Sequence, residues 1–152
     1  MVRFSGFDTI AVLMESVNFK LSISDKQSAA NSDESFVLWE ITVLCYHPLT
    51  KDKVDSYKVL RRFKEFDNLN NELKHKFHKY SKELPELKGK MAYLNILSKD
   101  NQDQRKENLE SYLRSISEYP NIFNTISFRK FIELDSTRID SLLSLTRGLS
   151  RS

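Results

Sequence analysis

The sequence predicts an α+β fold in which antiparallel strands come first along the chain and helices follow. In three stretches before about residue 60, apolar residues alternate with polar ones, as in a strand that buries one face. Beyond that point they recur every three or four residues, as on the buried stripe of an amphipathic helix. With 152 residues, the chain can bury a core of its own and has little room for a second domain.

The first strand is predicted at about residues 10–23, where Val17, Phe19 and Leu21 alternate with polar residues. The stretch that follows, residues 22–35, is polar, rich in small side chains and without periodicity. Because neither a strand nor a helix pattern is visible there, it is predicted to be a long mobile loop.

Residues 36–46 carry the strongest strand signal, because they are rich in β-branched and aromatic side chains. One face of this second strand holds Val37, Trp39, Ile41, Val43 and Cys45. A turn is predicted at residues 47–53, and a third strand follows over about residues 54–60. Three strands in succession indicate an antiparallel meander.

Three helical segments should follow the strands. The apolar stripe of the first consists of Phe63, Phe66, Leu69, Leu73 and Phe77. This helix should end before Leu84, because the residue that precedes a proline disfavours helical dihedral angles. After a long connection, a second helix is predicted at about residues 103–118, with Leu109, Tyr112, Leu113 and Ile116 facing inward. A break at residues 119–121 precedes the third, whose apolar residues are Ile126, Phe128, Phe131, Ile132 and Leu134.

The domain boundaries follow from these patterns. Residues 1–9 are predicted as an N-terminal extension, residues 10–135 as the domain, and residues 136–152 as a C-terminal amphipathic tail. The tail could bind a partner, lie on a membrane, pack on the domain, or lead into a missing region.

Composition narrows the class of protein. The chain is 39% hydrophobic and 30% charged, with one cysteine, Cys45, so no intramolecular disulfide can form and a reducing compartment is expected. The longest apolar run, residues 10–14, is too short to span a bilayer or to form the core of a signal peptide. We therefore expect a cytosolic protein, or a cytosolic piece of one.

The net charge of +3 is unevenly distributed. Residues 58–90 hold ten Lys or Arg against five Asp or Glu, a surplus of +5, which leaves the rest of the chain at −2. Such a surplus suits an anionic partner, although a solvated mixed-charge helix face would also explain it.

Signals of catalysis are weak. Cys45 lies in an apolar strand and is interpreted as a buried packing residue. His75 and His78 could face a metal together, but no third ligand has suitable spacing, so two surface histidines are expected. There is no glycine-rich phosphate loop and no hydrolase motif. The sequence therefore predicts a protein that is not an enzyme and has no cofactor or metal.

The informative stretch is residues 57–66, YKVLRRFKEF. Here a strand brings two arginines, Arg61 and Arg62, to the first turn of a helix, where unpaired N–H groups and the helix dipole favour anions. An arginine can grip two phosphate oxygens at once, and Phe63 could cover the apolar face of a sugar or inositol. Alternatively, both arginines could pair with carboxylates such as Glu65 or Asp67.

This junction, with residues 84–90 (LPELKGK) and 105–113 (RKENLESYL), resembles the PX domain of sorting nexins and related proteins. The resemblance covers about residues 10–135. It implies a three-stranded antiparallel meander packed against a helical subdomain of three to four helices. It also implies phosphoinositide binding, and thereby recruitment of the protein and attached partners to membranes.

The resemblance also assigns roles to individual residues. Arg62 matches the residue that grips the 3-phosphate, and Phe63 matches the aromatic ring beneath the inositol. Lys90 matches the lysine on the 1-phosphate, and Arg105 the arginine that binds the 4- and 5-hydroxyls. Together they imply phosphatidylinositol 3-phosphate as ligand, and a peripheral cytoplasmic location on endosome or vacuole membranes. The chain departs from the family pattern at Lys88, where a second proline is usual, and in having Phe63 where Tyr is commoner.

The loop after Lys90 is apolar, and in PX domains the corresponding loop dips into the membrane. Met91, Tyr93 and Leu94 are therefore expected to insert, although Leu94 could instead pack on the core. The alternative function is a PX-fold adaptor with weak lipid binding that holds a protein partner through the tail or residues 22–35. A nucleic-acid binder is not expected, because no recognisable motif accompanies the modest charge.

Overall fold

The computed structural model describes residues 12–31, 34–80, 82–87 and 99–150. One antiparallel sheet has the order β1-β2-β3, with β1 at Asn18–Asn31, β2 at Glu34–Tyr46 and β3 at Lys53–Arg62. The helices are α2 (Phe63–Lys76), α3 (Lys99–Ser117), α4 (Pro120–Phe123), α5 (Ile126–Phe131) and α6 (Ser136–Ser150), with a 3-10 turn, η1, at His78–Tyr80. The predicted α+β class and the antiparallel meander are confirmed.

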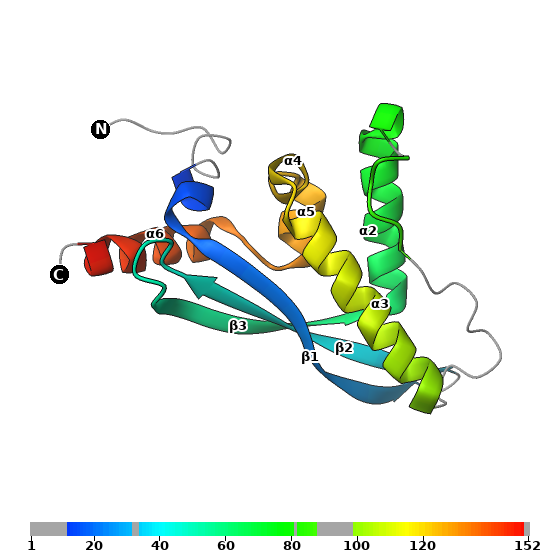
Figure 1. Ribbon diagram of the computed structural model, residues 1–152. Coiled ribbons are helices and arrows are strands. Elements are labelled where there is room, and N and C mark those ends of the chain that lie inside the picture. Colours follow the sequence, from blue (N-terminus) through cyan, green and yellow to red (C-terminus); the bar gives the residue numbers. More distant parts are fainter. Residues whose placement is uncertain (1–11, 32–33, 81, 88–98, 151–152) are drawn as a thin grey trace.

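The prediction of a mobile loop at residues 22–35 is wrong. Strand β1 runs on to Asn31, where it pairs with Glu34, so β1 and β2 form a long hairpin (Figure 1). A register shift between Ile23 and Asp25 bends the ladder before it continues. Antiparallel pairing uses backbone N–H and C=O groups, which every residue but proline supplies. Strand pairing in this segment therefore does not require the alternation of apolar and polar residues by which a half-buried strand is recognised in a sequence.

The first strand begins later than predicted, because residues 12–16 form a short helical turn. Leu13 within that turn and Val17 just after it are buried, and the Val17 N–H donates to the Leu13 carbonyl over 2.9 Å. Within β1 itself, Leu21 and Ile23 are buried, as alternation requires.

Strand β2 is the centre of the sheet, and its predicted inner face is confirmed. Its buried side chains are Val37, Trp39, Ile41, Val43 and Cys45. Cys45 is a free, fully buried thiol, as expected of a packing residue, and burial raises its pKa to about 12.

The helices are arranged around the two edges of the sheet. Helix α3 runs along β1 and α6 along β3, while α2 and α5 pack against each other (Figure 1). The inward residues predicted for the second helix, Leu109, Tyr112, Leu113 and Ile116, are all buried. The same is true of Phe66, Leu69 and Leu73 in α2.

Two polar contacts hold α3 in place. The Ile23 N–H, next to the register shift in β1, donates to Glu110 Oε1 over 3.0 Å. The Tyr112 hydroxyl donates to Oδ1 of Asn70 in α2 over 3.1 Å, and both side chains are buried. Because a buried polar group without a partner is costly, these bonds fix α3 against both β1 and α2.

Helix α5 departs from the prediction at one residue. Phe128, Phe131, Ile132 and Leu134 are buried as expected, but Ile126 is 63% exposed. The helix is only one and a half turns long, and its first residue lies beyond the core that the others fill. Thr125 caps it by accepting the Phe128 N–H over 3.1 Å.

The tail forms α6 and packs on the domain. Ile139 and Leu142 are buried, and the Arg138 guanidinium lies 3.5 Å from the centre of the Tyr57 ring in β3. The Tyr57 hydroxyl donates to the Ile132 carbonyl over 2.8 Å. Packing on the domain, one of the alternatives for the tail, is therefore what α6 does.

Tyr57 should make stability depend on alkaline pH. Burial raises the pKa of Tyr57 from its ordinary value of 10.0 to about 12, and Arg138 opposes that rise. The unfolded state loses the phenolic proton first, so the free energy of unfolding should fall as pH rises from 10 towards 12. Chemical denaturation across this pH range should show a smaller fall in the free energy of unfolding for Tyr57→Phe than for the unsubstituted chain. The raised pKa of Cys45 lowers the stability of both proteins in the same way, so it does not account for the difference. An equal fall would contradict the assignment.

Candidate functional site

The site predicted from the sequence lies where β3 passes directly into α2. Arg62 is the N-cap residue of α2, with extended dihedral angles of φ −82° and ψ 158°. Its N–H donates to Glu65 Oε1 over 3.0 Å. The following N–H groups of the first turn, and the positive end of the helix dipole, lie beside Arg62 and Phe63.

The two arginines of the junction have different surroundings. Arg61 faces α5, where its Nε donates to the Phe131 carbonyl over 3.0 Å and its Nη2 to the Lys130 carbonyl over 3.3 Å. Its guanidinium also lies 3.7 Å from carboxylate oxygens of Glu65 and Glu133. Pairing with carboxylates, the alternative considered for both residues, is therefore realised by Arg61. Its role is to hold the end of β3 against α5.

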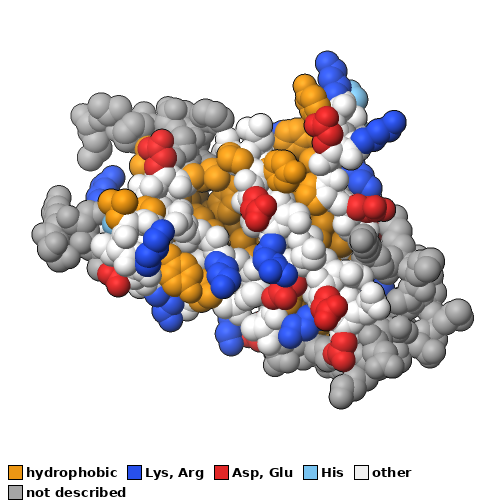
Figure 2. All heavy atoms as spheres, in the orientation of Figure 1, with side chains coloured by type: hydrophobic (Ala, Val, Ile, Leu, Met, Phe, Trp, Pro, Cys, Tyr) orange, Lys and Arg blue, Asp and Glu red, His pale blue; other side chains and the backbone are white. Residues whose placement is uncertain are grey.

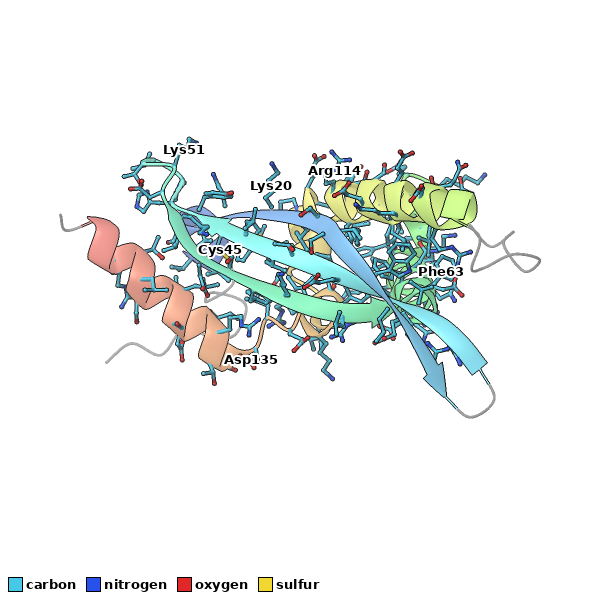
Figure 3. The ribbon with its side chains drawn as sticks, turned by 90° about the horizontal axis from the view of Figure 1, so that it is seen from below. Lys20, Cys45, Lys51, Phe63, Arg114 and Asp135 are labelled. Atoms are coloured by element: carbon cyan, nitrogen blue, oxygen red, sulfur yellow. The ribbon has the colours of Figure 1, made fainter. Side chains whose placement is uncertain are left out.

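Arg62 follows Arg61 in the strand, so the alternation of strand side chains directs it to the opposite face. Arg62 and Phe63 are both half-buried. On this face the Arg105 guanidinium, from α3, lies 4.0 Å from the centre of the Phe63 ring. The structure thus brings together Phe63 and Arg105, which are 42 residues apart in the sequence, beside Arg62. Figure 3 labels Phe63 at this end of the sheet, between α2 and α3.

The remaining predicted site residues lie outside the described part of the chain. These are Lys90 and the membrane-insertion residues Met91, Tyr93 and Leu94. The segment that leads to them is anchored on the core, since Leu87 is 8% exposed and Leu84 packs against the core cluster.

Most exposed lysines of the basic region lie far from this junction. Lys74, Lys76 and Lys79 lie at the C-terminal end of α2 and in η1, about 20 Å along the helix from Arg62. Figure 2 shows Lys and Arg interspersed with Asp and Glu across the middle of the face, and Lys and Arg gathered around the free end of α2. The sequence surplus of positive charge therefore does not by itself mark the site.

Glu65 is a site residue that sequence reasoning assigned only as a possible partner of the arginines. One carboxylate therefore contacts both arginines, accepting the backbone N–H of Arg62 and lying near the Arg61 side chain. The signal was available: a glutamate three residues after an N-cap position is typical of a capping box.

Other kinds of site find no support in the described residues. His75 and His78 are both exposed, and no group of three or more His, Cys, Asp or Glu side chains in that part of the chain could hold a metal ion. No helix within the described ranges is long and apolar enough to cross a bilayer.

Comparisons with known proteins agree with this architecture. The PX domain family model matches residues 49–135. Serine/threonine-protein kinase Sgk3 of Rattus norvegicus is 31% identical over 83 residues, which are 55% of this chain and 16% of the kinase. Sorting nexin C1711.11 of Schizosaccharomyces pombe is 30% identical over 122 residues, which cover 77% of this chain and 30% of the nexin.

Solved structures give the same result. A designed CISK-PX domain aligns with a TM-score of 0.62 and 25% identity, covering 75% of this chain and 98% of that one. The mouse SNX19 PX domain with bound sulphate ion aligns with a TM-score of 0.59 and 24% identity, covering 78% and 99% of the two chains.

The chain belongs to the PX domain family. It is therefore a phosphoinositide-binding module of the kind that recruits proteins to membranes, and its association with membranes is peripheral. The chain spans less than a third of the length of Sgk3 and of sorting nexin C1711.11, so the likeness to a kinase concerns the PX domain and not the kinase activity.

The different surroundings of Arg61 and Arg62 predict different effects on stability. Arg61→Ala should lower the free energy of unfolding by about 2–3 kcal/mol, because it removes charged donors from the Phe131 and Lys130 carbonyls. Arg62→Ala should change it by less than about 1 kcal/mol. Urea denaturation of the two variants measures both values. If Arg62→Ala were the more damaging, Arg62 would be a structural residue.

Proposed function

We propose that this PX domain binds phosphatidylinositol 3-phosphate through Arg62, Phe63, Lys90 and Arg105. Arg62 grips the 3-phosphate with its fork of donors, and the first turn of α2 adds a positive field beside it. Phe63 packs against the apolar face of the inositol. Lys90 contacts the 1-phosphate, and Arg105 donates to the 4- and 5-hydroxyls.

The observation that supports this proposal most directly is the approach of Arg105 to Phe63. The guanidinium lies 4.0 Å from the ring centre although the two residues come from different helices. A headgroup resting against Phe63 would therefore lie within reach of Arg105 on one side and Arg62 on the other. Additional phosphates at positions 4 and 5 would have to displace Arg105 from the ring, which explains a preference for the free hydroxyls.

The membrane contact is proposed to have two parts. The headgroup site supplies specific charge recognition, and Met91, Tyr93 and Leu94 supply apolar insertion beside it. Two such weak contacts together give reversible peripheral binding. The proposed location is the cytoplasmic surface of endosome or vacuole membranes, where this lipid is the mark that the family reads.

Headgroup recognition is tested by liposome flotation. Arg62→Ala should abolish binding to vesicles that contain phosphatidylinositol 3-phosphate, because the main phosphate ligand is lost. Arg114→Ala is the matched control, since it removes the same charge from an exposed position in α3, roughly 13 Å along that helix from Arg105. Retained binding by Arg62→Ala, or equal loss in both variants, would contradict the proposed site.

Membrane insertion is tested separately. Met91→Asp combined with Tyr93→Asp should weaken binding to the same vesicles but leave binding of a soluble inositol 1,3-bisphosphate headgroup unchanged. Leu49→Asp is the control, since Leu49 is 84% exposed in the β2–β3 turn, next to the labelled Lys51 at the far end of the sheet (Figure 3). Equal losses in the vesicle and headgroup assays would exclude insertion.

A further inference from the structure

Two hollows that share Ile126 in their lining lie on the side of the molecule where α5 lies. The first, about 380 Å³, lies between α2 and α5 and is lined by Leu69, Glu72 and Phe131 among others. The second, also about 380 Å³, lies between α5 and α6 and includes Leu134, Ile139 and Asp140. Ile126 and Lys130 line both hollows, and Ile126 is 63% exposed. A single exposed isoleucine is ordinary, but Ile126 lies beside a hollow with mainly apolar walls, the one between α5 and α6, and so forms part of a shaped surface. The hollow between α2 and α5 is lined mostly by polar and charged residues.

The rim of this double groove is acidic, although the chain as a whole is basic. Its exposed charged residues are Glu72, Glu133, Asp135, Asp140 and Lys130. Four of these five are negative at neutral pH, whereas the whole chain has a net charge of +3. Arg61 and Arg129 also line the hollows but are half-buried, and Arg61 is engaged by backbone carbonyls and two carboxylates.

The groove lies away from the headgroup site. Arg61 forms part of its wall, while Arg62 and Phe63 lie on the opposite face of the same junction. In Figure 3 Asp135, at the start of α6, and α3, which carries Arg105, lie along opposite edges of the sheet. A membrane bound at Arg62 would be anionic, so it would repel this rim rather than cover it. The groove therefore stays open when the lipid site is filled.

We propose that the double groove binds a protein segment in which a large apolar side chain is flanked by Lys or Arg residues. An apolar side chain beside Ile126 would fill the hollow between α5 and α6, and the basic residues would face the acidic rim. This arrangement, an apolar anchor inside a ring of complementary charge, is typical of a transient interface. The PX domain would then carry its partner to the membrane while bound to lipid. The inference does not depend on which phosphoinositide is recognised.

The test uses the whole chain and a fluorescein-labelled amphipathic peptide with a Leu stripe flanked by Lys, measured by fluorescence anisotropy. A matched peptide with Glu in place of every Lys is the charge control. Ile126→Asp should weaken binding of the basic peptide at least roughly tenfold. This substitution spares the fold, because Ile126 is exposed at the first position of α5, where an acidic residue suits the helix dipole. Leu49→Asp, an equal change at an exposed leucine elsewhere, should have no effect.

Charge reversal gives an independent measurement. Asp140→Lys combined with Glu72→Lys should weaken the basic peptide several-fold, and the loss should shrink at high salt. Three results would overturn the proposal: equal binding of the two peptides, binding insensitive to Ile126→Asp, or self-association of the chain that Ile126→Asp abolishes. The last result would make the groove an interface between copies. Liposome binding should be unchanged in Ile126→Asp, so failure here is distinct from failure of the lipid proposal.

Discussion

The hydrogen bonds from Arg61 to the carbonyls at the end of α5 are the constraint on which the rest of the site depends. Where a strand continues directly into a helix, no loop lies between them to adjust the direction of the chain. The junction must therefore be fixed by contacts with other parts of the molecule. Arg61 does this by joining β3 to Phe131 and Lys130, about 70 residues further along the chain. Once this arginine is fixed on the α5 side, strand alternation places Arg62 on the other side.

The second requirement is that α3 be placed accurately, because it carries Arg105. Glu110 binds a free backbone N–H of the edge strand β1, and Tyr112 binds Asn70 of α2 inside the core. Glu110 and Tyr112 lie within two turns of Arg105 on the same helix, so their hydrogen bonds fix the position of Arg105 relative to the Phe63 ring. The cation–π contact between Arg105 and Phe63 therefore depends on the packing of α3 against β1 and α2. The hydrogen bonds of Glu110 and Tyr112 can each be removed separately by mutation.

Charge is used on two opposite faces in different ways. The proposed headgroup site includes Arg62 at the start of α2 and Arg105 beside the Phe63 ring. The hollows beside Ile126 are lined by more acidic than basic residues. Such a division suits a module that joins a lipid surface to a protein, because an anionic membrane is attracted to one side and repelled by the other. The overall charge of +3 conceals this division.

The sequence alone determined the strand order, the inner face of β2, the stripe of α2 and the burial of Cys45, because regular alternation of apolar residues reports burial directly. It also determined that a phosphate-binding junction could exist, since arginines at a helix start are a local feature. Only the tertiary structure decided that residues 22–31 pair as a strand, that Ile126 lies outside, and that Arg61 is structural. Each of these depends on contacts between segments distant in the chain. Such contacts leave no periodic trace in a single sequence.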